Sequence, residues 1–408
     1  MTTGIRDLQP ARLEQALAAR SLTKGQLASL VGVSASTVTK WCKGDQSPGA
    51  ETFERIASVL NLQAEWLTRP VLKAIATPLY RKNSSALKAG LAKLGARTEW
   101  GQEVATRLAE HVDYPDLNLP ERSFTEPDQI RKSDIEEAAE ECRDLWQLGR
   151  APVQDLMLAA EGAGIIVFRE ETDVAVVEGL SSWSRELAGR PLVHLSADKA
   201  NGFRSRFDLA HEIGHLILHK HVEQRSDDKV RYNLMERQAH QFAGALLLPA
   251  QTFANDVRVP INLDNLLSLK QRWGASVGAM LMRLHFLGLL NDDEKLVLFK
   301  RRSARWGAKA EPGDDGWVPE RPRLLKRTVD LLVRESVLPV DRIAPFLGFS
   351  TNDVVQLCGL EAAYFSAPGR VVELATLRSS RTSPGMSDAT GLSTGAASVL
   401  KFEAGRRR

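Results

Sequence analysis

At 408 residues with 43 % hydrophobic content, the chain is long enough for two to four domains and too apolar to be disordered as a whole. The 54 lysines and arginines nearly balance the 51 acidic residues, so a nucleic-acid site must be a local surface. The three cysteines lack CxxC spacing, and no apolar run reaches the roughly 18 residues of a membrane span, which predicts a cytoplasmic protein without a disulfide framework.

Residues 1–70 are predicted to form an all-α DNA-binding domain with a helix-turn-helix. In QLASLVGVSASTVTKWCKG, apolar residues recur where two crossing helices meet, with a glycine at the turn and a serine capping the second helix. The residues expected to contact DNA are Gln26, Ser34, Ala35, Ser36, Thr37, Lys40 and Lys43. Because the basic surplus is small, eight residues against six, we expect a homodimer on double-stranded operator DNA. The alternative is a packing or dimerisation domain without DNA contact.

Residues 71–130 are predicted to be a helical linker, and residues 131–300 a second domain that opens with the helix SDIEEAAEECRDLWQLG. The runs GIIVFREETDVAVVEGLSSW and PLVHLS are β-branched or alternate with period two, which predicts strands. We expect PLVHLS to present a sheet edge that could pair with an extended substrate.

The stretch RFDLAHEIGHLILHKH contains an HExxH motif formed by His211, Glu212 and His215. On a helix, residues four apart lie on the same face, so the two imidazoles can bind one metal ion. Glu212 lies on the same side of the helix and can reach a water on that ion as general base. The motif therefore predicts a zinc hydrolase, with buried structural histidines or a purely structural zinc as the alternatives.

Three residues compete to be the third ligand. His221 requires a helix-breaking glycine where the sequence has Leu218, and His219 lies about two helical turns from His211, roughly 12 Å along the axis. Glu236 begins ERQAHQFAGALLLP on a face where a carboxylate is costly unless it is paired or ligated. We therefore predict zinc bound by His211, His215 and Glu236, with the fourth position left for water.

Two further histidines are candidates to support the chemistry. His219 is predicted to contact a ligand or the substrate, and both His219 and His240, which lies one turn after Glu236, are candidates to stabilise an oxyanion. Either residue could equally be structural.

Beyond residue 300 the sequence predicts a Gly-, Pro- and charge-rich linker, a C-terminal helical module within 301–378 and a disordered tail at 379–408. RIAPFLGFSTNDV repeats the register of QLASLVGVSASTV, but its second helix carries Asn352, Asp353 and Gln356 and no basic residue. We expect a packing or regulatory module, with a second DNA reader as the alternative.

These motifs together resemble two known families. Residues 8–68 resemble the XRE/Cro-like helix-turn-helix, and residues 134–250 resemble the ImmA/IrrE metallopeptidases through IEEAAEECRDLW, GLSSW, RFDLAHEIGHLILH and ERQAHQFAGALLLP. The resemblance implies zinc on His211, His215 and Glu236 and catalysis by Glu212. The departures are His240, where Asn is frequent, and LLLP in place of LLMP.

The resulting expectation is a multidomain, mainly α protein with a zincin-like α+β peptidase domain. Fused proteins of this kind are implied to cleave a helix-turn-helix repressor or antitoxin-like protein, which derepresses stress, mobile-element or phage-defence genes; single-stranded DNA is a candidate activating signal. The alternative is a regulator or antitoxin whose peptidase fold serves sensing or protein interaction without proteolysis. The intact HExxH favours the enzyme, because a scaffold has no need of Glu212.

Overall fold

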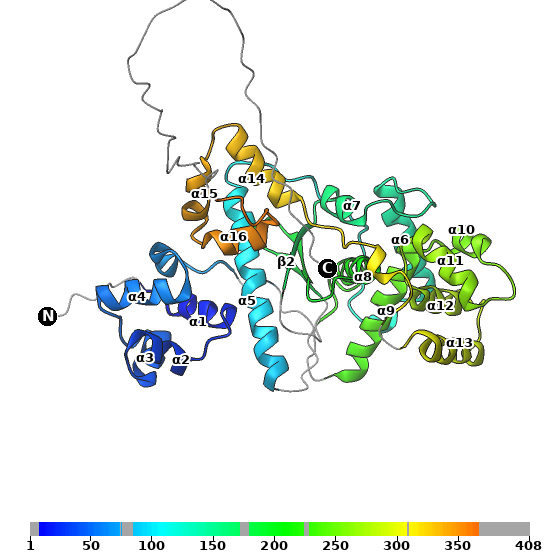
Figure 1. Cartoon of the computed structure of the whole chain (residues 1–408), viewed down its shortest axis with the longest axis horizontal. Helices are drawn as coiled ribbons and strands as arrows, with labels where there is room; N and C mark the ends of the chain where they lie inside the picture. The colour runs from blue at the N-terminus through cyan, green and yellow to red at the C-terminus, as the bar shows by residue number, and fades with distance from the viewer. Residues whose placement is uncertain are drawn as a thin grey trace, which may run out of the picture. The chain divides into compact units, whose positions relative to one another are not determined.

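The computed structural model describes residues 8–73, 75, 85–171, 179–223, 228–307 and 310–366. Within these ranges the chain forms sixteen α-helices and one three-stranded sheet, which confirms the mainly α fold with a small sheet (Figure 1). None of these helices combines the length and apolar character needed to cross a membrane. The predicted tail at 379–408 and part of the predicted strand region, 172–178, lie outside the described residues.

The N-terminal helices have clear local causes. Thr23 accepts a hydrogen bond from the Gln26 backbone N–H and begins α2, and Ser34 accepts one from the Thr37 N–H and begins α3. Between them Gly32 has φ of 75°, the left-handed turn that a glycine adopts without strain. The elements are α1 (Pro10–Ala19), α2 (Lys24–Val31), α3 (Ala35–Lys43), α4 (Ala50–Leu60) and the 3-10 helix η1 (Ala64–Thr68).

The long helix α5 (Ser85–Leu108) corrects the expectation of a helical linker at 71–130. Trp100 and Val104 of α5 are fully buried in a core shared with the N-terminal helices. Arg12 of α1 is also buried, and its Nη1 donates to Glu103 of α5 at 2.5 Å. This helix is a core element because its apolar face packs against α1 and the sheet, a contact that the local sequence does not reveal.

The central unit contains the sheet and a group of helices around it. Strand order is β1-β3-β2, with β1 parallel and β2 antiparallel to β3. PLVHLS is therefore the central strand, and the expectation that it presents an edge is wrong, because both of its edges are paired. The elements are η2 (Pro127–Gln129), α6 (Lys132–Leu145), α7 (Leu156–Gly162), β1 (Ile166–Glu170), β2 (Gly179–Ser184), β3 (Arg190–Ser196), α8 (Gly202–Leu218), α9 (Lys229–Leu247), α10 (Ala250–Asp256), α11 (Leu263–Trp273), α12 (Val277–Phe286) and α13 (Asp292–Trp306).

The sheet separates two hydrophobic cores. Successive side chains of a strand point to opposite faces. Accordingly Phe168 and Leu192 belong to the core formed with α5, α14 and α16, whereas Val193 and Leu195 belong to the core formed with α8 and α9. The helix that carries HExxH therefore lies on one face of the sheet, and the helices that reach the N-terminal domain lie on the other.

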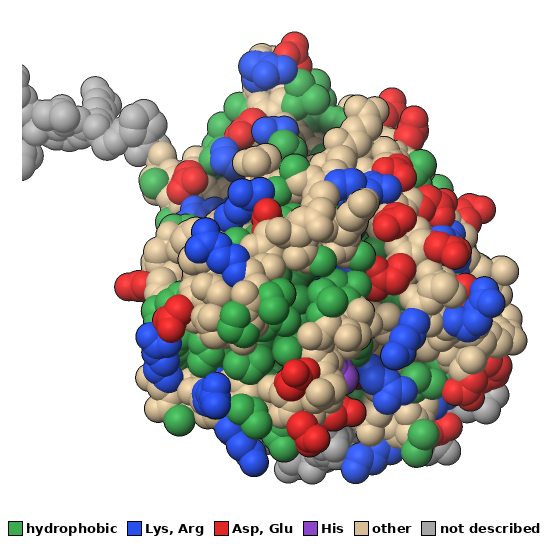
Figure 2. Space-filling model, turned by 90° about the vertical axis from the view of Figure 1, so that its right-hand side faces the viewer, with side chains coloured by type: hydrophobic (Ala, Val, Ile, Leu, Met, Phe, Trp, Pro, Cys, Tyr) green, Lys and Arg blue, Asp and Glu red, His purple; other side chains and the backbone are tan. Residues whose placement is uncertain are grey.

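The C-terminal unit consists of η3 (Asp314–Gly316), α14 (Leu324–Arg334), α15 (Val340–Leu347) and α16 (Thr351–Cys358). The predicted linker before it, ARWGAKAEPGDDGWVPERP, is held against the central unit within its described residues, 304–307 and 310–322. Glu320 pairs with Arg206 of α8 and accepts the N–H of Met157, and Glu311 accepts the Val277 N–H at 2.7 Å. The face drawn in Figure 2 intersperses acidic and basic side chains around a hydrophobic area, in line with the balanced composition.

Candidate metal centre

Helices α8 and α9 cross closely enough to bring HExxH against the second motif. A Cβ at Gly214, the glycine of HEIGH, would lie 3.2 Å from the Ala239 Cα and 3.1 Å from a ring carbon of Phe242. A larger residue at Gly214 would push the helices apart. The small residues at this crossing therefore place Glu236, near the middle of α9, opposite the two histidines.

The structure brings His211, His215 and Glu236 together at one point. The Nε2 atoms of the two histidines are 3.1 Å apart. Glu236 lies 3.5 Å from His211 Nε2 through Oε2 and 3.3 Å from His215 Nε2 through Oε1. All three side chains are partly open, with 12, 13 and 28 % of their surface exposed, so a fourth group can approach from solvent.

These separations match the donor set of a tetrahedral zinc ion. Two ligand atoms that each lie 2.0–2.1 Å from such an ion are about 3.3 Å from one another. The separations of 3.1, 3.3 and 3.5 Å, the last two through different oxygens of Glu236, are close to that value. Two imidazole nitrogens and one carboxylate therefore fit zinc in both chemistry and spacing.

His240 lies next to this cluster and offers an alternative ligand. Its ring stands 4.4 Å from that of His211, and ligand atoms of His211, Glu236 and His240 all lie within 4.8 Å of one another. The set that contains His215 has separations of 3.1–3.5 Å. His240 Nδ1 donates to the Glu236 backbone carbonyl at 2.7 Å, so in a neutral ring Nε2 carries a lone pair. That lone pair can bind a metal or accept a proton, whereas the predicted oxyanion role would need a protonated ring.

Glu212 lies between α8 and strand β2. Its side chain is buried, and a Cβ at Gly179 would stand 3.0 Å from its Oε1 and 3.2 Å from its Cγ. The first residue of β2 therefore leaves the space that the carboxylate occupies. Among the described strands β2 is at the sheet edge, so a peptide paired with that edge would pass beside Glu212.

The electrostatics of the cluster favour an ionised Glu236 and a neutral His219. Burial raises the pKa of Glu236, but hydrogen bonds with His211 and His215 lower it by more. The net effect is a pKa below the ordinary value, so the carboxyl is ionised at neutral pH. Burial lowers the pKa of His211, and Glu236 and Glu212 raise it to above its ordinary value. Burial, followed by repulsion from His215, lowers the pKa of His219 to about 3.

His219 does not reach the ligand cluster directly. It is 7 % exposed, its Nδ1 lies 3.0 Å from Nδ1 of His215, and its Nε2 lies 3.1 Å from Gln238 Oε1. Of the roles predicted for His219, this position fits contact with a ligand histidine rather than with substrate or an oxyanion. Gln238 is a residue that the sequence analysis missed, although its place two residues after Glu236 puts it on the helix that faces α8.

The predicted DNA-contacting residues lie on an exposed part of the N-terminal domain. The exposed ones are Gln26, Ser34, Ala35, Ser36, Lys40 and Lys43, and Thr37 is half-buried. Gln26 Oε1 accepts the Thr23 N–H at 2.8 Å, so its amide oxygen is used within the fold and its NH2 group is the part left for a phosphate.

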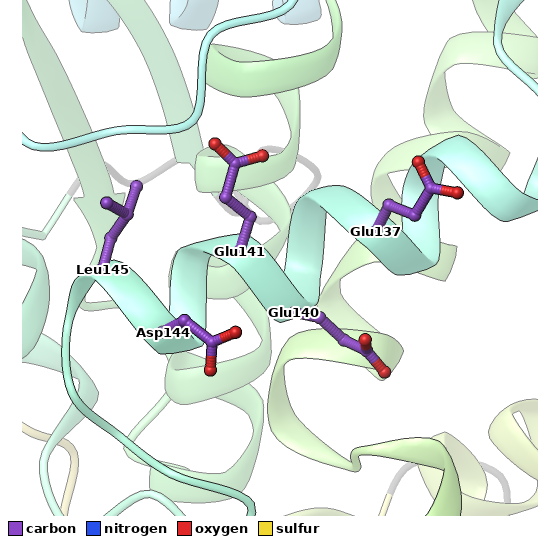
Figure 3. Close-up of a pocket in the computed structure, with 5 residues that line it drawn as sticks. All are labelled: Glu137, Glu140, Glu141, Asp144 and Leu145. Atoms are coloured by element: carbon purple, nitrogen blue, oxygen red, sulfur yellow. The ribbon is translucent and has the colours of Figure 1, made fainter.

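A second acidic feature lies on α6, away from the ligand cluster. Glu137, Glu140, Glu141, Asp144 and Leu145 line an open hollow, with the acidic side chains spread to either side of the helix (Figure 3). Two of these carboxylates already have basic partners, Arg122 at 2.7 Å from Glu141 and Arg150 at 2.6 Å from Asp144. The hollow is accordingly a solvated, ion-paired surface.

Comparison with known families agrees with this geometry. Residues 13–67 match the helix-turn-helix family model, and residues 160–285 match the model described as the IrrE N-terminal-like domain, a peptidase family. The chain thus contains an XRE-type helix-turn-helix at residues 13–67 and an IrrE/ImmA-like peptidase-family domain at residues 160–285. It is a DNA-binding regulator with a peptidase-family domain. A search of curated proteins found no match to the chain.

Proposed function

We propose that this protein is a zinc metalloendopeptidase that binds operator DNA and cleaves a helix-turn-helix repressor or antitoxin-like protein. The observation that carries the proposal is the ligand cluster, in which His211, His215 and Glu236 are 3.1–3.5 Å apart. Glu212 follows His211 directly on α8, and its charge helps to raise the His211 pKa, which supports its assignment as the base for hydrolysis of a peptide.

Each residue has a defined role in this proposal. His211, His215 and Glu236 would hold zinc, which supplies Lewis acidity toward a water and a substrate carbonyl. Glu212 accepts the proton of the attacking water and passes it to the leaving amine. The edge of β2 would hold the substrate main chain in extended form, because an unpaired strand offers its N–H and C=O groups to a peptide.

A regulator that senses without proteolysis remains the second candidate, and one observation favours it. The N-terminal domain is joined to the rest of the chain by two ion pairs at 2.5 Å, the buried pair of Arg12 with Glu103 and the partly buried pair of Arg20 with Asp353. Such pairs would transmit a change at the metal centre or the sheet to the DNA-binding helices. Cleavage and sensing are distinguished by Glu212, which only cleavage requires.

The test compares the wild type with Glu212→Gln. We expect one zinc per chain in both, because Glu212 is not a ligand. Each protein is incubated with the helix-turn-helix proteins encoded beside its gene, with and without single-stranded DNA. A discrete cut made by the wild type alone would support the peptidase.

Glu137→Gln, an acidic residue on α6, is the matched control and should cut as the wild type does. Zinc without any cut would favour the sensing regulator. A wild type that holds no zinc would contradict the metal centre itself.

A further inference from the structure

We propose that His219 and Gln238 are positioning residues that hold His215 in the tautomer with its free lone pair on Nε2, directed at the metal centre. The inference rests on the proposed function, since it concerns how this chain prepares one zinc ligand. It assigns a role to two buried side chains that contact neither the metal position nor the substrate.

A continuous line of contacts runs from the backbone to the ligand. Gln238 Nε2 donates to the Pro127 carbonyl at 2.8 Å, and Gln238 Oε1 lies 3.1 Å from His219 Nε2. His219 Nδ1 lies 3.0 Å from His215 Nδ1. The remaining nitrogen of His215, Nε2, faces His211 and Glu236.

The contacts of Gln238 with two backbone carbonyls determine which atom donates in each hydrogen bond of this series. Gln238 Nε2 is near two carbonyls, Pro127 O at 2.8 Å and Ile130 O at 3.4 Å, so a flipped amide would set its oxygen against two other oxygens. Gln238 therefore presents Oε1 to His219. A carboxamide oxygen only accepts, so His219 Nε2 must carry the proton.

The tautomer of His219 in turn determines the tautomer of the ligand His215. A neutral His219 with its proton on Nε2 has a lone pair on Nδ1, which accepts from His215 Nδ1–H. His215 is then left with a bare Nε2, the form of imidazole that binds a metal. The opposite tautomer of His215 would put two lone pairs face to face at 3.0 Å and a proton at the metal position.

Because His219 and Gln238 are buried, water cannot readily replace either of these hydrogen-bond partners. Gln238 is 4 % and His219 is 7 % exposed, so solvent offers little replacement for a lost partner. The other HExxH imidazole differs, because His211 Nδ1 is buried with no hydrogen-bond partner within the described part of the chain. Preparation of the site thus depends on one histidine, and loss of such outer contacts typically lowers metal affinity about 10- to 100-fold.

The first experiment measures zinc affinity of the full chain by competition with a chelator. His219→Leu keeps the bulk and removes the acceptor, and we expect its zinc affinity to fall about 10- to 100-fold. His219→Asn places an amide oxygen near the position of Nδ1, and we expect it to restore the affinity to within about threefold of the wild type. Gln238→Ala should fall about 10-fold.

The matched control is Gln241→Ala, since Gln241 is also buried on α9 but takes no part in this line of contacts. It should bind zinc as the wild type does. Equal affinity of His219→Leu and the wild type would overturn the proposal. So would equal losses in His219→Asn and His219→Leu, because that pattern would mean packing alone matters.

A second measurement does not depend on zinc. In the zinc-free chain labelled with 15N-histidine, we expect the His215 signals to show a proton held on Nδ1 in the wild type, and a mixture of rings with and without that proton in His219→Leu. A wild-type His215 without a proton on Nδ1 would overturn the positioning role. If the wild type bound no zinc, the proposed function would fail while this spectrum still decided the tautomer.

Discussion

Two segments of the molecule share one local design and have opposite surroundings. α2–α3 and α15–α16 each join two short helices through a left-handed glycine, Gly32 with φ of 75° and Gly348 with φ of 89°. In each, a serine caps the second helix by accepting the N–H three residues on, from Thr37 after Ser34 and from Asp353 after Ser350. Turn and cap chemistry therefore produce the same motif twice.

What differs is the side chain at the third position of the second helix. Thr37 of α3 is half-buried and follows two exposed residues, Ala35 and Ser36. The corresponding residue of α16, Asp353, is fully buried and accepts from Arg20 at 2.8 Å and Arg97 at 2.6 Å. The turn and the cap thus determine the helix-turn-helix geometry. The residue at the third position of the second helix, threonine or a buried aspartate, differs between the exposed and the internal copy.

The largest effect should come from neutralising this buried carboxylate. Asp353→Asn removes the carboxylate that pairs with Arg20 and leaves Arg97 with its second acidic partner, Glu170 of β1. We expect the free energy of unfolding to fall by about 3 kcal/mol. Denaturant unfolding of the full chain measures it. The control Glu51→Gln, in an exposed pair with Arg55, should leave the unfolding midpoint almost unchanged; equal shifts in the two variants would contradict the internal role of α16.

The acid stability of the chain should depend on the same residue. Burial raises the pKa of Asp353, but Arg20 and Arg97 lower that pKa more, to below its ordinary value. A carboxyl whose pKa is lower in the folded state stabilises above its unfolded pKa of about 3.9 and loses this contribution as pH falls through the folded pKa. Unfolding followed from pH 7 to pH 3 should therefore show the gap between wild type and Asp353→Asn narrowing only at the acid end. A constant gap would argue against the lowered pKa.

Removing the two capping hydroxyls should separate the two motifs more finely. Ser34→Ala loses one cap, at a cost of about 1 kcal/mol. Ser350→Ala should cost about 2 kcal/mol, because the Ser350 hydroxyl also donates to Asp353 Oδ2 at 2.6 Å. Thermal unfolding of both variants measures the difference, and a larger loss for Ser34→Ala would reverse the comparison.

The smallest effect concerns DNA. Lys40 and Gln356 occupy equivalent positions, six residues after their capping serines. We expect Lys40→Ala to lower affinity for the promoter region of its own gene about fivefold and to reduce the salt dependence by about one phosphate contact. Gln356→Ala should change neither. Fluorescence anisotropy at two salt concentrations provides the measurement, and weakening by Gln356→Ala alone would assign DNA reading to α16.

Local chemistry in the sequence predicted much of the fold and of the candidate site. The caps at Thr23 and Ser34 and the i, i+4 spacing of His211 and His215 are properties of neighbouring residues, and the structure contains them. Glu236 was predicted as a ligand because an unpaired carboxylate on an inner helix face is energetically costly, and its side chain lies beside His215. These features needed no knowledge of distant contacts.

The features that were missed depend on residues far apart in the chain. Arg97 and Asp353 are 256 positions apart, and no local pattern announces their pairing. The central position of β3 had a partial signal, since Pro191, Leu192 and Val193 form an apolar run without the alternation of a half-exposed strand. The structure buries every residue from Pro191 to Leu195, including the polar His194. Gln238 could be placed only once α8 and α9 were seen to cross.

The two-sided sheet has a consequence for how this protein can be divided or recombined. The family-matched segment 160–285 includes all three strands but neither α5 nor α16, the helices that cover one sheet face. Cut out alone, it would expose Phe168, Leu192 and their neighbours to water and tend to aggregate. A peptidase domain transferred from this chain into another protein would therefore need other helices to cover that face of the sheet. The family-matched segment alone is poorly suited to such a transfer.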